Sequence, residues 1–341
     1  MADLTSREIR LKIRPVGLPA EKDFELSQVT VGEVGAGQLL VQNVYMSVDP
    51  YMRGRMLERK SYVPPFEIGK ALEGAAVGRV LESNNDKFKK GDYVQSFLGW
   101  REYFVSDGSG LTKVDASLAP VQAYLGVLGM TGMTAYFGLL KHGTPKAGET
   151  VFVSAASGAV GAIVCQVAKL KGCRVVGSAG SDAKVDWLIN EVGIDAAMNY
   201  KKEKNLTRKL HELCPEGIDV YFENVGGAHF EAALEVMNDF GRVAMCGMIS
   251  QYNEILPPKG PANLAQVIGK RIRIQGFIVS DHMGEMNAFY ADMAKWLSDG
   301  KIKYKETIID GIENAPKAFI GLFTGDNFGK MLVRMKPDAT A

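Results

Sequence analysis

Residues 150–184 place a short apolar run, a cluster of small residues and a helical pattern in an order that few folds accommodate. Val151–Val153 is fully apolar, as in a buried central strand of a parallel sheet. Small residues fill positions 154–158, and apolar residues then recur at helical spacing from 160 to 170. Arg174–Gly177 predicts the next strand. The stretch therefore predicts a βαβ unit.

The turn between the first strand and the helix carries a variant glycine motif, in which Ala156, Gly158 and Gly161 stand at the fingerprint positions. Alanine is small enough for the tight turn, Gly158 permits close approach of a diphosphate, and Gly161 permits close packing of helix on strand. Because a helix N-terminus attracts anions, the expected ligand is the pyrophosphate of a dinucleotide. The alternative is a tight turn in an α/β domain that binds nothing.

The end of the second strand bears on the choice of cofactor. Sites for NAD place an acid there for the ribose 2′-hydroxyl, whereas a cation accommodates a 2′-phosphate. Here Ser178 and Ser181 follow, no acid occurs before Asp182, and Lys184 comes next. This pattern favours NADP(H). The alternative is that Lys184 is a solvated residue in the first turn of a helix.

Length and charge narrow the class of protein. The 341 residues suggest two domains, and the net charge of +1 argues against nucleic acid or an acidic membrane as the main partner. The charged N-terminus does not resemble a signal peptide, so we expect a cytoplasmic protein. Residues 116–140 carry no charge, but proline and glycines interrupt them, which favours a buried helix pair over a membrane span. The four cysteines form no CxxC pair, which argues against a disulfide scaffold.

The rest of the chain divides into a β-rich part and an α/β part. Residues 1–115 predict short strands with glycine turns, typical of a small barrel or sandwich. Residues 150–280 alternate strands and helices, which predicts a doubly wound parallel sheet. The expected strands are 9–13, 39–48, 77–81, 93–97, 101–106, 195–200, 218–224, 241–249 and 271–279, with helices at 229–238 and 285–299. The tail, with strands at 305–310 and 330–336, is expected to complete the first domain.

Seven stretches, in the right order along nearly the whole chain, resemble one family. They are VDPYMRGRM (48–56), GMTGMTAYFGLL (129–140), SAASGAVGAIVCQVAKLKGCRVVGSAGS (154–181), NYK (199–201), ENVGG (223–227), CGMISQYN (246–253) and GDNFGK (325–330). The chain resembles the zinc-independent medium-chain dehydrogenases/reductases, in their group of alkenal, prostaglandin and curcumin reductases.

The resemblance implies a fold and an assembly. A GroES-like β-rich barrel domain for the substrate is expected at 1–125 and 305–341. A Rossmann-type domain for NADP(H), with a doubly wound parallel sheet, is expected at 126–304. The α/β protein is then expected to be a homodimer that uses a small enone or enal as substrate.

The resemblance also implies cofactor-binding residues. Lys184 and Tyr200 would hold the 2′-phosphate, and Asn224 would lie near the nicotinamide. Met130 and Thr134 would lie beneath the nicotinamide, and Phe277 and Val279 would flank it. The remaining expected cofactor contacts are Ala156, Gly158, Ala159, Val160, Gly161, Ser178, Cys246, Gly247, Ile249, Ser250 and, from the tail, Asn327.

Two tyrosines are candidates for the chemistry. Without a metal or an obvious base, reduction of an activated C=C bond is favoured over alcohol oxidation, because it needs only donors aimed at the developing enolate oxygen. The resemblance implies that Tyr252 is the catalytic residue, binding the substrate carbonyl as hydrogen-bond donor, and that Tyr51 is a substrate-binding wall. For Tyr51 the alternative is packing in the barrel. The rival functions are a zinc-independent quinone oxidoreductase and a non-catalytic NADPH-binding protein.

The sequence predicts activity without a metal. A catalytic zinc takes about three protein ligands, and residues 1–140 contain neither Cys nor His, while His142, His211, His229 and His282 are expected as surface or capping residues. We expect NADPH oxidation to survive dialysis against a strong chelator, with no stoichiometric zinc by elemental analysis. Chelator-sensitive activity that added zinc restores would contradict this.

Overall fold

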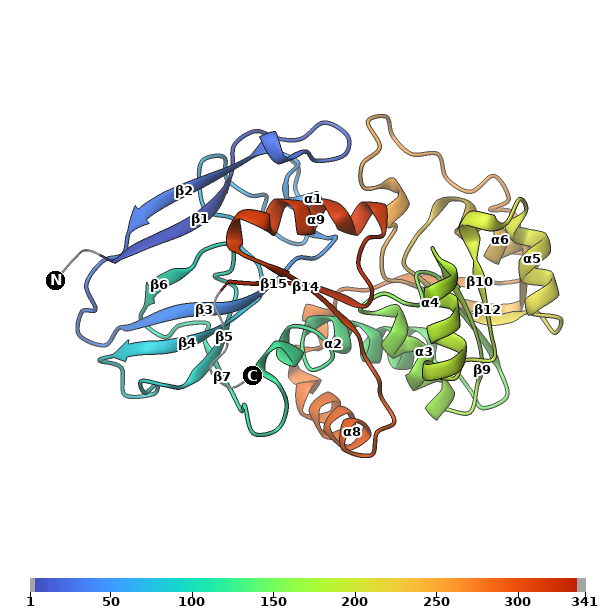
Figure 1. Ribbon diagram of the computed structural model, residues 1–341. Coiled ribbons are helices and arrows are strands. Elements are labelled where there is room, and N and C mark those ends of the chain that lie inside the picture. The colour runs from blue at the N-terminus through green and yellow to red at the C-terminus, as the bar shows by residue number, and fades with distance from the viewer. Residues whose placement is uncertain (1–3, 336–341) are drawn as a thin grey trace. The chain divides into compact units, whose positions relative to one another are not determined.

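The computed structural model describes residues 4–335, which form two compact units. Unit 1 comprises the residues up to Gly126, Glu306–Asn327 and the residues from Met331 on. Unit 2 comprises Val127–Lys305 and Phe328–Lys330. Figure 1 shows both units with their elements labelled.

Unit 1 is β-rich. A seven-stranded antiparallel sheet has the order β14-β15-β3-β4-β5-β7, with β6 also paired to β3, and β1 and β2 form a separate antiparallel pair. The strands are β1 (Thr5–Leu11), β2 (Phe24–Thr30), β3 (Leu39–Ser47), β4 (Ala76–Ser83), β5 (Tyr93–Ser96), β6 (Tyr103–Ser106), β7 (Thr112–Val114), β14 (Glu306–Asp310) and β15 (Lys330–Arg334). The helices are α1 (Met52–Arg55) and α9 (Ala315–Thr324), and a 3₁₀ turn, η2, covers Val121–Leu125.

The core of unit 1 joins residues from the two ends of the chain. The rings of Phe24 and Trp100 stack with centroids 6.2 Å apart, and Phe319 of α9 meets Trp100 edge-on at 6.3 Å. All three are buried in one apolar cluster with Val333 of β15. The C-terminal segment therefore supplies part of the core of this unit.

Unit 2 is an α/β domain. Its parallel sheet has the order β10-β9-β8-β11-β12-β13, so β9 and β10 follow on one side of β8, and β11, β12 and β13 on the other. The strands are β8 (Thr150–Val153), β9 (Arg174–Ala179), β10 (Ala196–Asn199), β11 (Ile218–Glu223), β12 (Met237–Met245) and β13 (Arg273–Gly276). This order is that of a doubly wound dinucleotide-binding fold, which confirms the predicted fold class.

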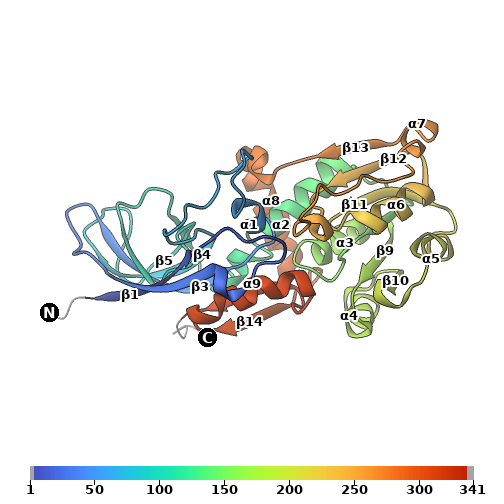
Figure 2. The ribbon, with the colours of Figure 1, turned by 90° about the horizontal axis from the view of Figure 1, so that it is seen from above.

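The helices of unit 2 are α2 (Met130–Phe137), α3 (Gly161–Leu170), α4 (Asp182–Trp187), α5 (Leu206–Leu213), α6 (Gly227–Val236), α7 (Gln266–Gly269) and α8 (Met286–Ser298). Right-handed crossovers place α3 and α4 on one face of the sheet and α5 and α6 on the other. Figures 1 and 2 show this arrangement. No helix in residues 4–335 is long and apolar enough to cross a membrane.

Several element boundaries differ from the sequence prediction. Ile13 lies beyond the end of β1 and is 47% exposed. The chain leaves α6 at Val236, so β12 begins at Met237, within the stretch predicted as helix. Helices α5 and α9 were not predicted, although the leucines of α5 recur at helical spacing, at 206, 210 and 213.

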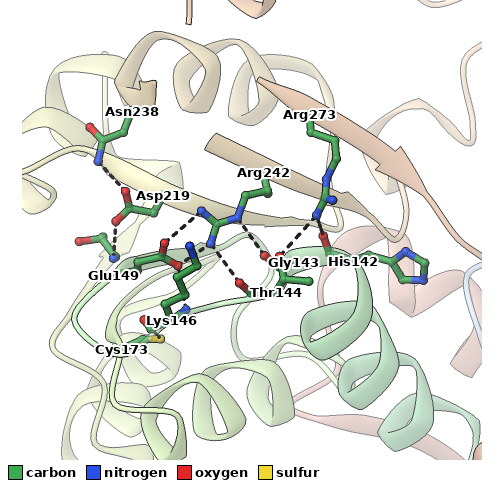
Figure 3. Close-up of polar contacts among 11 residues, drawn as sticks. His142, Gly143, Thr144, Lys146, Glu149, Cys173, Asp219, Asn238, Arg242 and Arg273 are labelled. Atoms are coloured by element: carbon green, nitrogen blue, oxygen red, sulfur yellow. Dashed lines mark hydrogen bonds and ion pairs between the residues drawn. The ribbon is translucent and has the colours of Figure 1, made fainter. Parts of the chain in front are cut away.

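A polar network holds the amino edge of the sheet in unit 2 (Figure 3). Arg242 of β12 forms an ion pair with Glu149, and its guanidinium also donates to the carbonyls of Gly143 and Thr144 at 3.2 and 3.1 Å. Arg273 donates to the carbonyl of His142 at 2.8 Å. Because Arg242 pairs with Arg273, the first residue of β13, and with Val220, near the start of β11, the network stabilises the sheet at the edge opposite the strand ends that bind ligands in such folds.

We expect Arg242→Ala to lower the free energy of unfolding by about 2 kcal/mol, because Glu149 and two carbonyls lose a charged donor. For a unit of this size that corresponds to a drop in Tm of about 4–8 °C. Arg208→Ala, which removes an exposed ion pair with Glu212, is the matched control and should change Tm little. Equal losses of Tm in both variants would contradict the stabilising role of Arg242.

The loss of stability caused by Arg242→Ala should depend on pH. Burial tends to raise the pKa of Glu149, but Arg242 and the Lys146 amide outweigh it and hold that pKa below its ordinary value. A depressed carboxyl pKa stabilises the fold at neutral pH, and this contribution is lost as pH falls through it. The difference in Tm between the wild type and Arg242→Ala should therefore shrink below about pH 4.

Candidate functional site

The candidate site lies at the carboxyl edge of the sheet in unit 2. Strand order reverses between β8 and β11, and ligands of doubly wound sheets bind at such a switch point. The loops after β8, β9, β11 and β12 all leave the sheet at this edge. Most of the expected cofactor contacts are on these four loops.

The glycine turn after β8 has the close packing that its motif predicts. Gly161 is the first residue of α3, and a Cβ there would lie 2.3 Å from the carbonyl oxygen of Ala155. Ala155 itself has a φ of 49°, a left-handed conformation that costs energy for a residue with a side chain. Ala156, Gly158, Ala159 and Val160 complete the turn, so the amides of the first helical turn lie at the switch point.

The C-terminal segment pairs with this turn. Gly329 forms a β-bridge with Gly158, and its amide donates to the carbonyl of Ser157 at 3.1 Å. Phe328 packs edge-on against Trp187 with ring centroids 5.2 Å apart. The expected tail contact, Asn327, immediately precedes this segment and is itself part of unit 1.

The end of β9 presents polar groups to the same edge. Ser178 is fully buried, and its Oγ has no hydrogen-bond partner among the described residues, while its carbonyl accepts the Ala156 amide at 2.9 Å. Ser181 caps α4 by accepting the Lys184 amide. An orphaned buried hydroxyl beside a serine cap and a lysine fits the ribose and 2′-phosphate of NADP(H).

Tyr200 lies at the same strand end. Its phenol oxygen is 3.4 Å from the position that a Cβ on Gly180 would take, one residue beyond β9. The ring of His229 meets the Tyr200 ring edge-on, with centroids 4.9 Å apart. The structure therefore brings Tyr200 to the region of Ser181 and Lys184, as the resemblance implies.

The expectation that the histidines are surface or capping residues is wrong for His229. It is 5% exposed, and burial lowers its pKa to about 4, so the ring is neutral at physiological pH. His142 and His282 form a pair, with their Nε2 atoms 3.1 Å apart. Among the described residues no group of three His, Cys, Asp or Glu side chains is arranged to hold a metal ion.

The loops after β11 and β12 are joined to each other by hydrogen bonds. The Ile249 amide donates to the carbonyl of Asn224 at 3.2 Å. The amide and hydroxyl of Ser250 both donate to the carbonyl of Val225, at 3.0 and 2.6 Å. These contacts place Asn224 beside the segment that contains Cys246, Gly247, Ile249 and Ser250.

Tyr252 follows a 3₁₀ turn, η6 (Ile249–Gln251), and folds back over the β12 loop. Its phenol oxygen accepts a hydrogen bond from the Met248 amide at 3.2 Å. It would lie 2.9 Å from a Cβ on Gly247, so glycine there permits the close approach. The candidate catalytic phenol is thus held against the backbone that follows β12.

The remaining candidates are on α2, after β13 and in unit 1. The Thr134 hydroxyl donates to the carbonyl of Met130 within α2 at 2.7 Å. Phe277 stacks on His142 with centroids 4.8 Å apart, and Val279 begins a 3₁₀ segment, η7 (Val279–Glu285). Tyr51 precedes α1 and packs against the apolar core of unit 1, where burial, with a contribution from Asp49, raises its pKa.

Sequence reasoning did not assign roles to Ser154 and Glu223. Both are fully buried, and the Ser154 hydroxyl donates to Glu223 Oε1 at 2.9 Å. The available signal was that each is a polar residue directly at the end of an apolar strand. Their hydrogen bonds depend on the alignment of β8 with β11, which no local pattern specifies.

Two family models match the chain: "N-terminal domain of oxidoreductase" over residues 7–114 and "Zinc-binding dehydrogenase" over residues 159–299. The chain is 45% identical to an NADPH-dependent curcumin reductase of Escherichia coli, with 96% of each chain covered. It is also 45% identical to a 2-alkenal reductase (NADP(+)-dependent) of Nicotiana tabacum, over 97% of this chain and 98% of the relative. A solved structure of CurA in complex with NADPH from Vibrio vulnificus matches with a TM-score of 0.93 and 44% identity, covering 97% of this chain and 100% of that one.

Lys184 should discriminate between the two nicotinamide cofactors. Lys184→Ala removes a cation at the end of β9, so kcat/KM with NADPH should fall about tenfold or more, while kcat/KM with NADH stays near its wild-type value. Lys204→Ala, an exposed lysine in the turn before α5, is the control and should change neither value. Equal losses of kcat/KM with NADPH and NADH would contradict the assignment of Lys184 to the 2′-phosphate.

Proposed function

Because the chain belongs to the zinc-independent medium-chain dehydrogenases/reductases, in their group of alkenal, prostaglandin and curcumin reductases, we propose that it reduces the C=C bond of α,β-unsaturated ketones and aldehydes. It is an NADP-dependent oxidoreductase, and its cofactor is NADP(H). The observation that carries the proposal is the placement of the Tyr252 phenol against the β12 loop, beside Asn224.

When bound, NADPH would supply a hydride to the β-carbon of the enone, and the α-carbon would take its proton from solvent or from a phenol. The loops of unit 2 hold the cofactor: the turn at 156–161 receives the pyrophosphate, and Ser178, Lys184 and Tyr200 receive the adenosine ribose and its phosphate. Asn224 and the segment from Cys246 to Ser250 line the nicotinamide end. Burial raises the pKa of the Cys246 thiol to about 12, so it remains protonated and is not a nucleophile at neutral pH.

Tyr252 acts on the substrate carbonyl in this proposal. A phenol keeps its proton at neutral pH and donates a hydrogen bond to an oxygen that gains negative charge. The Met248 amide fixes the phenol oxygen, which reduces the reorganisation needed when the enolate forms. We propose that Tyr51 lines the substrate site. The alternative is that Tyr51 only packs in unit 1, and its contact with the apolar core of that unit supports this alternative.

The expected assembly follows from the resemblance. We propose a homodimer that works in the cytoplasm and binds neither nucleic acid nor membrane. The near-zero net charge supports the absence of a nucleic-acid partner. Sedimentation analysis with and without NADPH tests the dimer directly.

The C=C bond of a simple enone should be reduced with its carbonyl left intact, and NMR with mass spectrometry of the product measures this. Tyr252→Phe should lower kcat about a hundredfold, or about 3 kcal/mol, because one donor to the developing enolate oxygen is lost. Tyr290→Phe, which removes a partly buried phenol from α8, is the matched control and should keep wild-type kcat.

Four outcomes would overturn parts of this assignment. An allylic alcohol as product excludes a double-bond reductase. Turnover of quinones with no turnover of enones favours the quinone oxidoreductase, and NADPH binding without any turnover favours a non-catalytic protein. Full kcat in Tyr252→Phe together with a loss in Tyr51→Phe would exchange the roles of the two tyrosines.

A further inference from the structure

Glu223 is a buried carboxyl group that the proposed chemistry does not use. It is the last residue of β11 and is 0% exposed. It forms no ion pair with any of the described residues. Burying a carboxyl group costs free energy unless the group is neutral or its oxygens accept hydrogen bonds. The hydrogen bonds of Glu223 therefore indicate what it does.

Glu223 contacts the loops of three neighbouring strands. Its Oε1 accepts the Ser154 hydroxyl, after β8, at 2.9 Å, and the amide of Val225, after β11, at 2.6 Å. Its main-chain carbonyl accepts the amides of Cys246 and Gly247, after β12, at 2.9 and 3.0 Å. One residue therefore joins the ends of β8, β11 and β12.

These contacts extend to the candidate catalytic groups. The Asn224 amide donates to Ser154 Oγ at 2.9 Å, and Asn224 Nδ2 donates to the Ser154 carbonyl at 2.7 Å. The Glu223 carboxyl holds Ser154 by accepting its hydroxyl, so it fixes the acceptor that orients Asn224. Ile249 donates to the Asn224 carbonyl in turn, which connects the same chain of contacts to the segment that ends at Tyr252.

We propose that Glu223 is a positioning residue that aligns the loops after β8, β11 and β12, and through them Asn224 and Tyr252, for NADPH binding and hydride transfer. The contribution to NADPH binding rests on hydrogen bonds within unit 2 alone. The contribution to kcat also rests on the proposed function of the enzyme.

Burial favours the neutral form of the carboxyl group, and its Oε2 atom has no hydrogen-bond partner among the described residues. Burial raises the pKa of Glu223, with the Val225 and Gly226 amides, Tyr221 and Ser154 opposing. The titratable groups that face it are the Tyr221 phenol on β11 and the Cys246 thiol after β12, and burial raises the pKa of both. Neither of these groups is a cation that would stabilise the carboxylate. The neutral amide of Gln should therefore substitute for the carboxyl group without loss of function.

The test compares Glu223→Gln with Glu223→Ala. The Gln variant keeps an oxygen that accepts from Ser154 and Val225, so its Kd for NADPH and its kcat should stay within about twofold of wild type. The Ala variant leaves both donors without their acceptor, so Kd should rise and kcat should fall, each about tenfold. Fluorescence titration measures NADPH binding independently of turnover, which separates this inference from the choice of substrate.

A matched control separates positioning from general stability. Leu210→Val alters the core cluster of unit 2 from α5, outside these loops, so Tm should fall while Kd and kcat remain at wild-type values at 25 °C. If Glu223→Ala yields no folded protein, Ser154→Ala breaks the same contact from the other side and should raise Kd and lower kcat. Wild-type Kd and kcat in a folded Ala variant would overturn the proposal, as would equal losses in the Gln and Ala variants.

The pH dependence of stability gives a second readout. As pH rises above the ordinary carboxyl value of 4.5, Glu223 ionises in the unfolded chain before it does in the folded protein, because burial raises its pKa there. The wild type therefore loses stability relative to Glu223→Gln until the raised pKa of the folded state is reached. The Tm of the Gln variant should thus exceed that of the wild type progressively above about pH 5. A wild-type Tm that rises relative to the Gln variant over this range would show an ionised, stabilised carboxylate and overturn the neutral assignment.

Discussion

Backbone groups at the carboxyl ends of parallel strands run out of ladder partners, and the loops that leave the sheet must satisfy them. In unit 2 the carbonyls of Glu223, Asn224 and Val225 accept amides from the segment after β12. These bonds continue the pairing of β11 with β12 beyond the last paired residues. The positions of Asn224 and Tyr252 depend on this continued pairing, because both residues belong to segments that it connects.

The two edges of the same sheet solve this problem differently. At the amino edge, charged side chains reach the backbone: Arg242 and Arg273 donate to carbonyls that precede β8. Around Glu223 at the carboxyl edge, the contacts are made instead by amides, hydroxyls and a buried carboxyl group. Ion pairs at the amino edge add stability at a distance from the edge that receives the negative charges of a dinucleotide.

Much of the fold could be predicted from sequence patterns, because local periodicity and small residues indicate strand 151–153, the glycine turn and helix 160–170. The resemblance added Tyr200, whose placement over Gly180 depends on the pairing of β9 with β10 and is not visible in either stretch alone. No role could be predicted for Glu223 and Ser154, because the role of a buried polar residue depends on its hydrogen-bond partner across the sheet. Helix α9 escaped because its apolar residues pack on a core whose other half is far away in sequence. The roles of the candidate site residues remain predictions.

The bridge between Gly158 and Gly329 joins the glycine turn to a segment near the end of the chain. A ribosome releases the chain from its N-terminus, so the sheet of unit 2, including β13, has emerged before Gly329 appears. Until then the turn lacks the strand that pairs with it. The nascent protein thus completes its dinucleotide turn only after the whole sheet of unit 2 has been synthesised, and a chain truncated before Gly329 would carry the strands of the sheet with an unfinished turn.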